Sequence, residues 1–443
     1  MSKKRRQRWR DEEPGSLLKF IGAAALVGLA TGLMAASFRI LLEELSHLRD
    51  LLLEWSQGSI LGLLVVVLVC SAAVTVAAAL VHRVEPHAEG SGISRVEAVV
   101  AGRIEPGRRR ILPVKYFGGL LAMGSGLALG REGPSVQMGG SIGIWVSRML
   151  GLTRYDLRVL VAAGAAAGLA TAFNAPIAGG VFVLEELVRR FDPRTTLATL
   201  LASGAGFTSA QLLLTNEREF DIAAIGDPTL MQAPIVVAVG LVTGLLGVVY
   251  NRFVMFGLRL ADASTWPVEV RAALIGAMIG LVGWISPSII GSGHNLAQDA
   301  LLGQGTVLAA CGIVVIRMVL GIISYAAATP GGMFAPMLVL GSQAGLAVGL
   351  VGYSLAPDVA PEPAAFALIG MAAFFTATVR APVTGVVLAT ELTGSTAVLP
   401  PMLGACAVAM LVAHVLKAEP IYDLLTKRSA KAARLNARET GIA

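Results

Sequence analysis

Long apolar runs recur along the whole chain and constrain its fold more than any other feature. Residues 59–81, 233–250 and 306–316 form three of these runs, and several approach the roughly 20 residues that a helix needs to cross a bilayer. Hydrophobic residues make up 55% of the sequence and charged residues only 14%, and the mean hydropathy is +0.73. The sequence therefore predicts an all-α protein with many membrane-spanning segments.

Both ends of the chain are basic. The first ten residues, MSKKRRQRWR, contain no acid, and the segment after Leu416 adds Lys417, Lys427, Arg428, Lys431, Arg434 and Arg438. By the positive-inside rule, residues 1–16 and 426–443 are expected to be cytoplasmic. A cleaved signal peptide over residues 16–36 is the competing interpretation, but the charged leader and the many later spans favour a retained first helix. The net charge of +6 then reflects topology, and no nucleic-acid partner is expected.

One short motif places an acid inside an apolar stretch. Residues 130–134 read GREGP, with apolar residues directly before them and no charge between Ser135 and Val146. A carboxylate in a bilayer is costly, so Glu132 is expected to have a function. The glycines let the backbone approach a ligand, and Pro134 suits the first turn of a helix, where free N–H groups carry partial positive charge. The motif predicts an anion site with an acid placed in it.

Three motifs of the first half recur in the second half in the same order. GSGIS begins at residue 90, and GSGHN begins at residue 291. GREGP around Glu132 matches GGMFAP around Phe334, and NAPIAGGVFVLEE from Asn174 matches RAPVTGVVLATEL from Arg380. Because the three spacings are nearly equal, the matches imply a duplicated unit. We expect a first membrane repeat over residues 17–214 and a second over 233–425.

The linker between the repeats, residues 215–232, is polar and acidic. Against one Arg218 it holds Glu217, Glu219, Asp221 and Asp227. Lacking a basic excess, it is expected to be extracytoplasmic, so the two repeats would cross the membrane with inverted topology. The helix breaks at Ser91, Glu132, Met333 and the Ala-Pro segments would then converge near the midplane on one site lined by N–H groups and positive helix ends.

These motifs resemble the chloride-site signatures of the CLC family of chloride channels and proton/chloride antiporters, in its prokaryotic antiporter-like branch. GSGIS, GREGP, GGMFAP and the terminal Tyr422 occur in the family's order, and the resemblance runs from about Leu17 to Leu425. It implies two inverted repeats of short tilted helices and a homodimer with one pore per subunit. It also implies a lipid bilayer, the cell's inner membrane, as the location, and chloride and protons as the transported ions.

The resemblance assigns roles position by position. Ser91 resembles the serine whose hydroxyl contacts the anion, and Tyr422 resembles the tyrosine that closes the site from the cytoplasm. The backbone N–H groups of Met333 and Phe334 are the other expected chloride ligands. Glu132 resembles the gating glutamate, whose carboxylate occupies an anion position and swings away when protonated. Neutral donors and helix dipoles suit such a path because they replace hydration without trapping the ion.

Glu185 and Glu186 bear on whether the protein is an antiporter or a channel. Glu186 resembles the internal proton acceptor of the antiporters, where channels usually have a neutral residue. The competing interpretation is that one or both glutamates pair with Arg189 or Arg190. We favour this structural interpretation for Glu185, which Glu391 matches in the second repeat, and proton transfer for Glu186. The sequence thus predicts a proton-coupled chloride antiporter, a secondary transporter and not an enzyme.

Two departures from the family pattern are not expected to change the ion. Ser94 stands where the family has proline, and Met333 replaces a commoner isoleucine but presents only its N–H. No regulatory domain is expected after Tyr422. The presence of both Ser91 and Tyr422 disfavours the fluoride-exporting relatives.

Two alternative functions stay open at the level of sequence. A passive chloride channel would share the fold but would not move protons. An intramembrane serine hydrolase would use Ser141, since residues 139–143 fit G-x-S-x-G, although a nucleophile elbow requires a preceding strand and a histidine partner. None of the histidines has the spacing of a metal site, so neither a metal nor a cofactor is expected.

Overall fold

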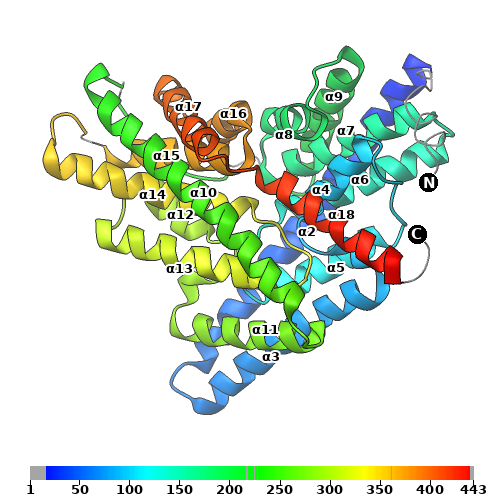
Figure 1. The fold of residues 1–443 in the computed structure, drawn as a ribbon, viewed down its shortest axis with the longest axis horizontal. Helices are drawn as coiled ribbons and strands as arrows, with labels where there is room; N and C mark the ends of the chain where they lie inside the picture. Colours follow the sequence, from blue (N-terminus) through cyan, green and yellow to red (C-terminus); the bar gives the residue numbers. More distant parts are fainter. Residues whose placement is uncertain (1–15, 216–217, 224, 227, 361, 440–443) are drawn as a thin grey trace.

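The computed structural model describes residues 16–215, 218–223, 225–226, 228–360 and 362–439, with residues 432–439 described by their backbone only. The basic leader at residues 1–10, Glu217 and Asp227 lie outside the described residues, as do the side chains of Arg434 and Arg438. Within the described ranges the fold consists of helices α2 to α18 without a β-strand (Figure 1). This confirms the predicted all-α fold.

The helices of the two halves correspond in order. The first half contains α2 (Leu17–Ser56), α3 (Ile60–Ala79), α4 (Ile93–Val100), α5 (Ile111–Gly124), α6 (Glu132–Met149), α7 (Arg154–Phe173), α8 (Pro176–Phe182) and α9 (Pro193–Ala210). The second half contains α10 (Ala233–Ala263), α11 (Val268–Ile285), α12 (His294–Leu301), α13 (Val307–Tyr325), α14 (Phe334–Leu355), α15 (Pro363–Val379), α16 (Pro382–Thr393) and α17 (Leu399–Val415). A final helix, α18 (Ile421–Glu439), follows the second half.

The two halves also pack in the same way. Helix α6 packs on α7 as α14 packs on α15, and α2 packs on α9 as α10 packs on α17. Contacts between the halves join corresponding helices, α3 with α11 and α8 with α16, which lie side by side in Figure 1. Such contacts are those expected of two copies of one unit related by a two-fold axis. The duplication inferred from the motif spacing is confirmed by this packing.

Polar and left-handed residues fix the ends of the helices. The hydroxyls of Ser59 and Thr153 accept hydrogen bonds from backbone N–H groups in the first turns of α3 and α7, at 3.3 and 3.2 Å. Helices α7 and α15 are followed directly by Asn174 and Arg380, which have φ values of 54° and 73°. In both halves an Ala-Pro pair follows and begins the next helix. The helix breaks predicted at the Ala-Pro segments are therefore present.

Seven helical segments in the described part of the chain are long and apolar enough to cross a membrane. They are Leu17–Ser56, Ile60–Val84, Arg154–Phe173, Leu230–Ala263, Val268–Ile285, Val307–Tyr325 and Phe334–Leu355. The most hydrophobic window of α7 is 89% buried, whereas that of the span containing α3 is only 28% buried. Helix α7 therefore belongs to the centre of the protein, and α3 presents an apolar surface to its surroundings.

Two glutamates join the halves by a reciprocal exchange. The carboxylate of Glu391 accepts hydrogen bonds from the N–H groups of Ile177 and Ala178 at the start of α8, at 3.0 and 2.6 Å. The carboxylate of Glu185 accepts hydrogen bonds from the N–H groups of Val383 and Thr384 at the start of α16, at 3.1 and 2.7 Å. A carboxylate is favoured at a helix N-terminus because it satisfies free N–H groups and the helix dipole.

This exchange corrects one expectation from the sequence. Glu185 has a structural role, as expected, but the prediction that it pairs with Arg189 or Arg190 is wrong. Its partners are Val383 and Thr384 at the N-terminus of α16, whose N–H groups have no acceptor within their own helix.

We expect Glu185→Gln and Glu391→Gln each to lower the free energy of unfolding by about 1 kcal/mol, because each removes the charge from a helix N-terminal contact. Thermal unfolding of the purified protein in detergent measures the effect. Glu44→Gln on the exposed face of α2 is the matched control. Losses no larger than that of the control would contradict the proposed contribution of these contacts.

Candidate anion and proton site

The glycine-rich segments predicted to converge do meet. The N–H of Gly130 donates to the carbonyl of Gly332 at 2.7 Å, and the N–H of Gly332 donates back to Gly130 at 2.8 Å. The loop containing Ser91 joins them, because the N–H of Gly331 donates to the carbonyl of Gly90 at 3.0 Å. Backbone pairing therefore brings together three breaks that lie far apart in the sequence.

Ser91 lies against the first turn of α6. A Cβ atom added to Gly133 would lie only 2.7 Å from the Cβ of Ser91, so glycine is required for this approach. Gly92, in the left-handed conformation with φ of 77°, turns the chain into α4. Ser91 is buried, and its N–H donates to the hydroxyl of Tyr325 at 3.3 Å.

The carboxylate of Glu132 lies at the N-terminus of α14. Its Oε2 accepts a hydrogen bond from the N–H of Ala335 at 3.3 Å, and the side chain is buried. Helix N-termini carry free N–H groups and partial positive charge, so the carboxylate occupies a position that suits an anion. Glu132 also lines a cavity of about 650 Å³, which we call the outer cavity and which Arg131, Glu219 and His294 line as well. Glu132 thus stands between the helix N-terminus and this cavity.

Aromatic rings connect two of the predicted anion ligands. Phe334 and Tyr422 both contact Phe182, with ring centroids 5.7 and 6.4 Å apart. The hydroxyl of Tyr422 is buried without a hydrogen-bond partner in the described structure. A buried donor without a partner is costly and is consistent with a ligand that the structure does not contain. Met333 is buried directly before α14.

Phe182 was not among the residues selected from the sequence. It lies at the end of α8. The one feature of the sequence that could have indicated its role is that it belongs to the segment beginning with Ala-Pro. Tyr422, at the start of α18, directly precedes Asp423, which shares the guanidinium of Arg189 with Glu186. Phe334, Tyr422, Glu132 and Glu186 therefore lie in one region of the structure. Ser91 lies on the loop whose backbone pairs with the segment before α14.

Glu186 lies in a π-helical turn after α8 and is buried. The guanidinium of Arg189 donates to its Oε1 at 3.2 Å and to Asp423 at 2.7 Å. The expected arginine partner is therefore present, but it contacts Glu186 and not Glu185. A second buried carboxylate that the sequence analysis missed, Glu97 on α4, pairs with Arg103 near α18.

Two buried cations donate hydrogen bonds to carbonyl groups of the glycine loops. The ammonium of Lys115 donates to the carbonyls of Ala88 and Gly90 at 3.1 and 2.5 Å. The guanidinium of Arg317, at the corresponding position of the second half, donates to the carbonyls of Gly291 and Ser292 at 2.9 and 2.8 Å. Both side chains are fully buried, so the loops are fixed by charged donors that face carbonyl groups.

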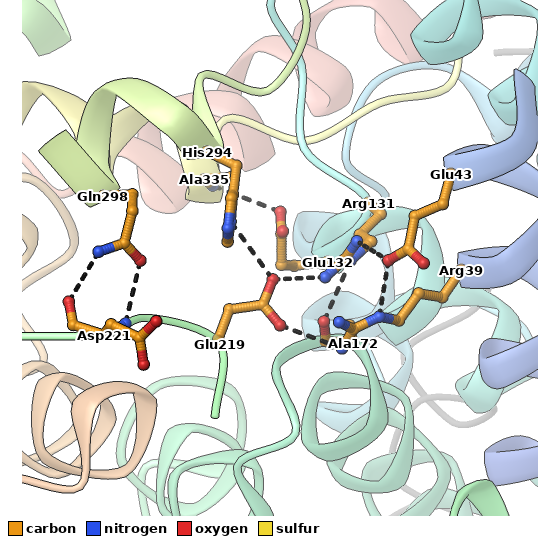
Figure 2. Close-up of polar contacts among 10 residues, drawn as sticks. All are labelled: Arg39, Glu43, Arg131, Glu132, Ala172, Glu219, Asp221, His294, Gln298 and Ala335. Carbon is orange, nitrogen blue, oxygen red and sulfur yellow. Dashed lines mark hydrogen bonds and ion pairs between the residues drawn. The ribbon is translucent and has the colours of Figure 1, made fainter. Parts of the chain in front are cut away.

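The outer cavity contains a network of charged side chains around Arg131 (Figure 2). Its guanidinium donates to the carbonyl of Ala172 at 3.1 Å and to Glu219 of the linker at 2.6 Å. Glu219 also pairs with Arg39 of α2 at 3.0 Å. The linker thus contacts the residue directly before Glu132, which sequence reasoning did not anticipate.

The hydrolase alternative finds no support at Ser141. The residue lies inside α6, and its hydroxyl donates to the carbonyl of Gln137 one turn earlier, at 2.8 Å. A nucleophile elbow needs a turn between strand and helix, and this serine lies within a continuous helix.

Comparison with known proteins identifies the family. The family model described as voltage gated chloride channel matches residues 73–414. The chain is 34% identical over 429 residues to the H(+)/Cl(-) exchange transporter ClcA of Vibrio parahaemolyticus, covering 94% of this chain and 91% of that protein. A protein of the same name from Vibrio vulnificus is 35% identical with the same coverage. The chain therefore belongs to the voltage-gated chloride channel (CLC) family and is a multi-pass membrane protein.

Solved structures agree with this assignment. The crystal structure of a slow cyanobacterial Cl⁻/H⁺ antiporter matches with a TM-score of 0.89 and 31% identity, covering 93% of this chain and 97% of that chain. A eukaryotic CLC transporter and a CLC-type fluoride/proton antiporter share the fold, with TM-scores of 0.76 and 0.75 at 21% and 22% identity. The family resemblance drawn from the motifs is confirmed.

Proposed function

We propose that the protein is a secondary transporter that exchanges chloride for protons across the membrane. One observation carries this proposal: the carboxylate of Glu132 occupies the N-terminus of α14, where an anion would be stabilised, and it also borders the outer cavity. A group so placed can leave the anion position when it takes up a proton. The relatives named as H(+)/Cl(-) exchange transporters, at 34% and 35% identity, support the same function.

The proposed anion path runs through neutral donors. Ser91 offers its hydroxyl, Met333 and Phe334 offer N–H groups at the start of α14, and Tyr422 offers its hydroxyl. The buried and unpartnered hydroxyl of Tyr422 supports this assignment. Such donors replace the hydration of chloride while leaving it free to move on, whereas a direct contact with Lys115 or an arginine would hold it.

The proposed proton path uses two carboxylates. Glu186 is the internal acceptor near α18, and Glu132 is the gate that both ions share. Glu186 is buried, and Arg189, which contacts it, also contacts Asp423 directly after Tyr422. Both observations support a position beside the anion path. Protonated Glu132 would release its anion position to chloride.

The proposed membrane arrangement follows from the charge distribution. Both termini are cytoplasmic, the linker at residues 215–232 is extracytoplasmic, and the repeats at residues 17–214 and 233–425 have inverted topology. Residues 1–16 and 426–443 are the basic cytoplasmic ends. We place the protein in the inner membrane as a homodimer with one path per subunit.

A flux assay on purified protein in lipid vesicles tests the function. An outward chloride gradient is imposed, and chloride and protons are followed together with an electrode and a pH-sensitive dye. Uphill proton movement driven by chloride is the expected result. Chloride movement without coupled protons would instead identify a passive channel.

We expect Ser91→Pro to raise nitrate transport relative to chloride by about fivefold, because a hydroxyl donor favours a small spherical ion over a larger planar one. The substitution also removes the N–H that contacts Tyr325. Anion competition in the same vesicles measures the ratio. Ser94→Pro, in the same motif but within the first turn of α4, is the matched control. An unchanged ratio in Ser91→Pro would count against Ser91 as a ligand.

A further inference from the structure

Glu219 of the linker places its carboxylate among two guanidinium groups and an imidazole from separate elements. Its Oε1 lies 2.6 Å from the guanidinium of Arg131, which precedes α6, and 3.7 Å from Nδ1 of His294 on α12. Its Oε2 lies 3.0 Å from the guanidinium of Arg39 on α2. Figure 2 shows the carboxylate between these groups, and Phe220 stacks on the His294 ring with centroids 4.6 Å apart.

This arrangement has the chemistry of an anion position. Two guanidinium groups and an imidazole converge on one point at the wall of the outer cavity, and the Glu219 side chain is only 8% exposed there. Burial raises the pKa of the Glu219 carboxyl, but Arg131 and Arg39 lower it by more, so that the net pKa lies below the ordinary value of glutamate. The group in this position is therefore the ionised carboxylate of Glu219, which is part of the chain itself.

We propose that Glu219 fills an outer anion site formed by Arg39, Arg131 and His294, and that its carboxylate keeps a transported anion from being held there. The inference rests on the proposed function only in taking that anion to be chloride. Arg131 directly precedes Glu132, and the residues of this site line the same outer cavity as Glu132, so an ion that reaches the gate through this cavity passes close to the site. Without Glu219 the two guanidinium groups would share only the exposed Glu43 as a counter-charge and would bind a small anion strongly, and transport requires that the ion also leave.

The other acid near these arginines does not occupy the same position. Glu43 pairs with Arg39 at 2.9 Å and with Arg131 at 3.3 Å, but its side chain is 52% exposed. It neutralises the same two cations from the rim, whereas Glu219 lies between them. This difference provides a matched control, because substituting either residue changes the charge of the outer cavity equally.

The first test locates the anion directly. Crystals of Glu219→Ala, Glu219→Gln and Glu43→Ala are grown in bromide, and the anomalous signal of bromide is mapped. We expect bromide between Arg39 and Arg131 in Glu219→Ala only. In Glu219→Gln the neutral amide still fills the space, and in Glu43→Ala the tethered carboxylate remains. Absence of bromide in Glu219→Ala, or its presence in Glu43→Ala, would overturn the proposal.

The second test measures the consequence for transport. With chloride supplied on the linker side, we expect Glu219→Ala to lower both the apparent KM for chloride and the maximal rate by about fivefold, because the ion binds more tightly and leaves more slowly. Glu43→Ala should change each less than twofold, on the order of a screened surface charge. An unchanged rate in Glu219→Ala would contradict the role. Proton coupling of the wild type is recorded in the same vesicles, so a failure of the exchanger proposal is seen separately from a failure of this one.

Discussion

Replacing Glu132 by glutamine is expected to abolish proton movement while chloride movement continues. The amide has the shape of a protonated carboxyl group but cannot take up or release a proton. It also carries no charge, so it competes less with chloride for the N-terminus of α14. In vesicles with a chloride gradient, proton flux should fall at least about tenfold, to the level of protein-free vesicles.

Glu44→Gln is the control for this variant, since it makes the same chemical change on the exposed face of α2. It should leave both fluxes as in the wild type. Persistent chloride-driven proton pumping in Glu132→Gln would show that the gate has been assigned to the wrong residue.

Replacing Glu186 by glutamine is expected to remove proton flux and to keep chloride flux. The proposed anion path, through Ser91, Met333, Phe334 and Tyr422, does not use this carboxylate. A proton from the cytoplasm, however, needs a titratable group before it reaches Glu132. The same flux assay should show chloride movement at about the wild-type rate and at least a tenfold loss of proton movement.

The neighbouring glutamate provides a matched control. Glu185→Gln removes an adjacent carboxylate whose partners are the N–H groups of Val383 and Thr384, so it should cost stability and preserve proton coupling. If the wild type moves no protons uphill in a chloride gradient, the protein is a passive channel. Glu186 is then a structural partner of Arg189, which it contacts at 3.2 Å.

The sequence was sufficient for features encoded in local motifs and their spacing. Apolar runs predicted the helices, and the recurrence of GSG and GREGP-like segments predicted the duplication. The meeting of the loop that contains Ser91 and the segment that contains Glu132 with the residues before α14 followed from the expected convergence of helix breaks. These features were accessible because glycine, proline and an isolated acid leave few alternatives in an apolar chain.

Contacts between segments that are distant in the sequence could not be predicted in the same way. Glu185 lies 198 positions before Val383, and its own neighbourhood offered two nearby arginines as more obvious partners. Glu219 lies 88 positions after Arg131, and nothing in the linker indicates that it folds back into the outer cavity. Long-range pairing of this kind depends on the packing of both halves, which no single motif records.

One available signal was overlooked. Lys115 and Arg317 are cations in apolar helices at corresponding positions of the two halves, and each binds the carbonyls of its own glycine loop. A charge that recurs inside a membrane segment indicates a buried partner. The repeat spacing already determined from the motifs would have pointed to both.

The reciprocal contacts of Glu185 and Glu391 have a consequence for how such a chain arose. Each half supplies a carboxylate that accepts hydrogen bonds from the first N–H groups of a helix in the other half. A chain with one half alone would leave both its carboxylate and these N–H groups without partners. Two identical single-unit chains would satisfy each other by the same exchange. An ancestor assembled from two separate copies of one unit could therefore have made the same contacts before the two units were joined in one polypeptide.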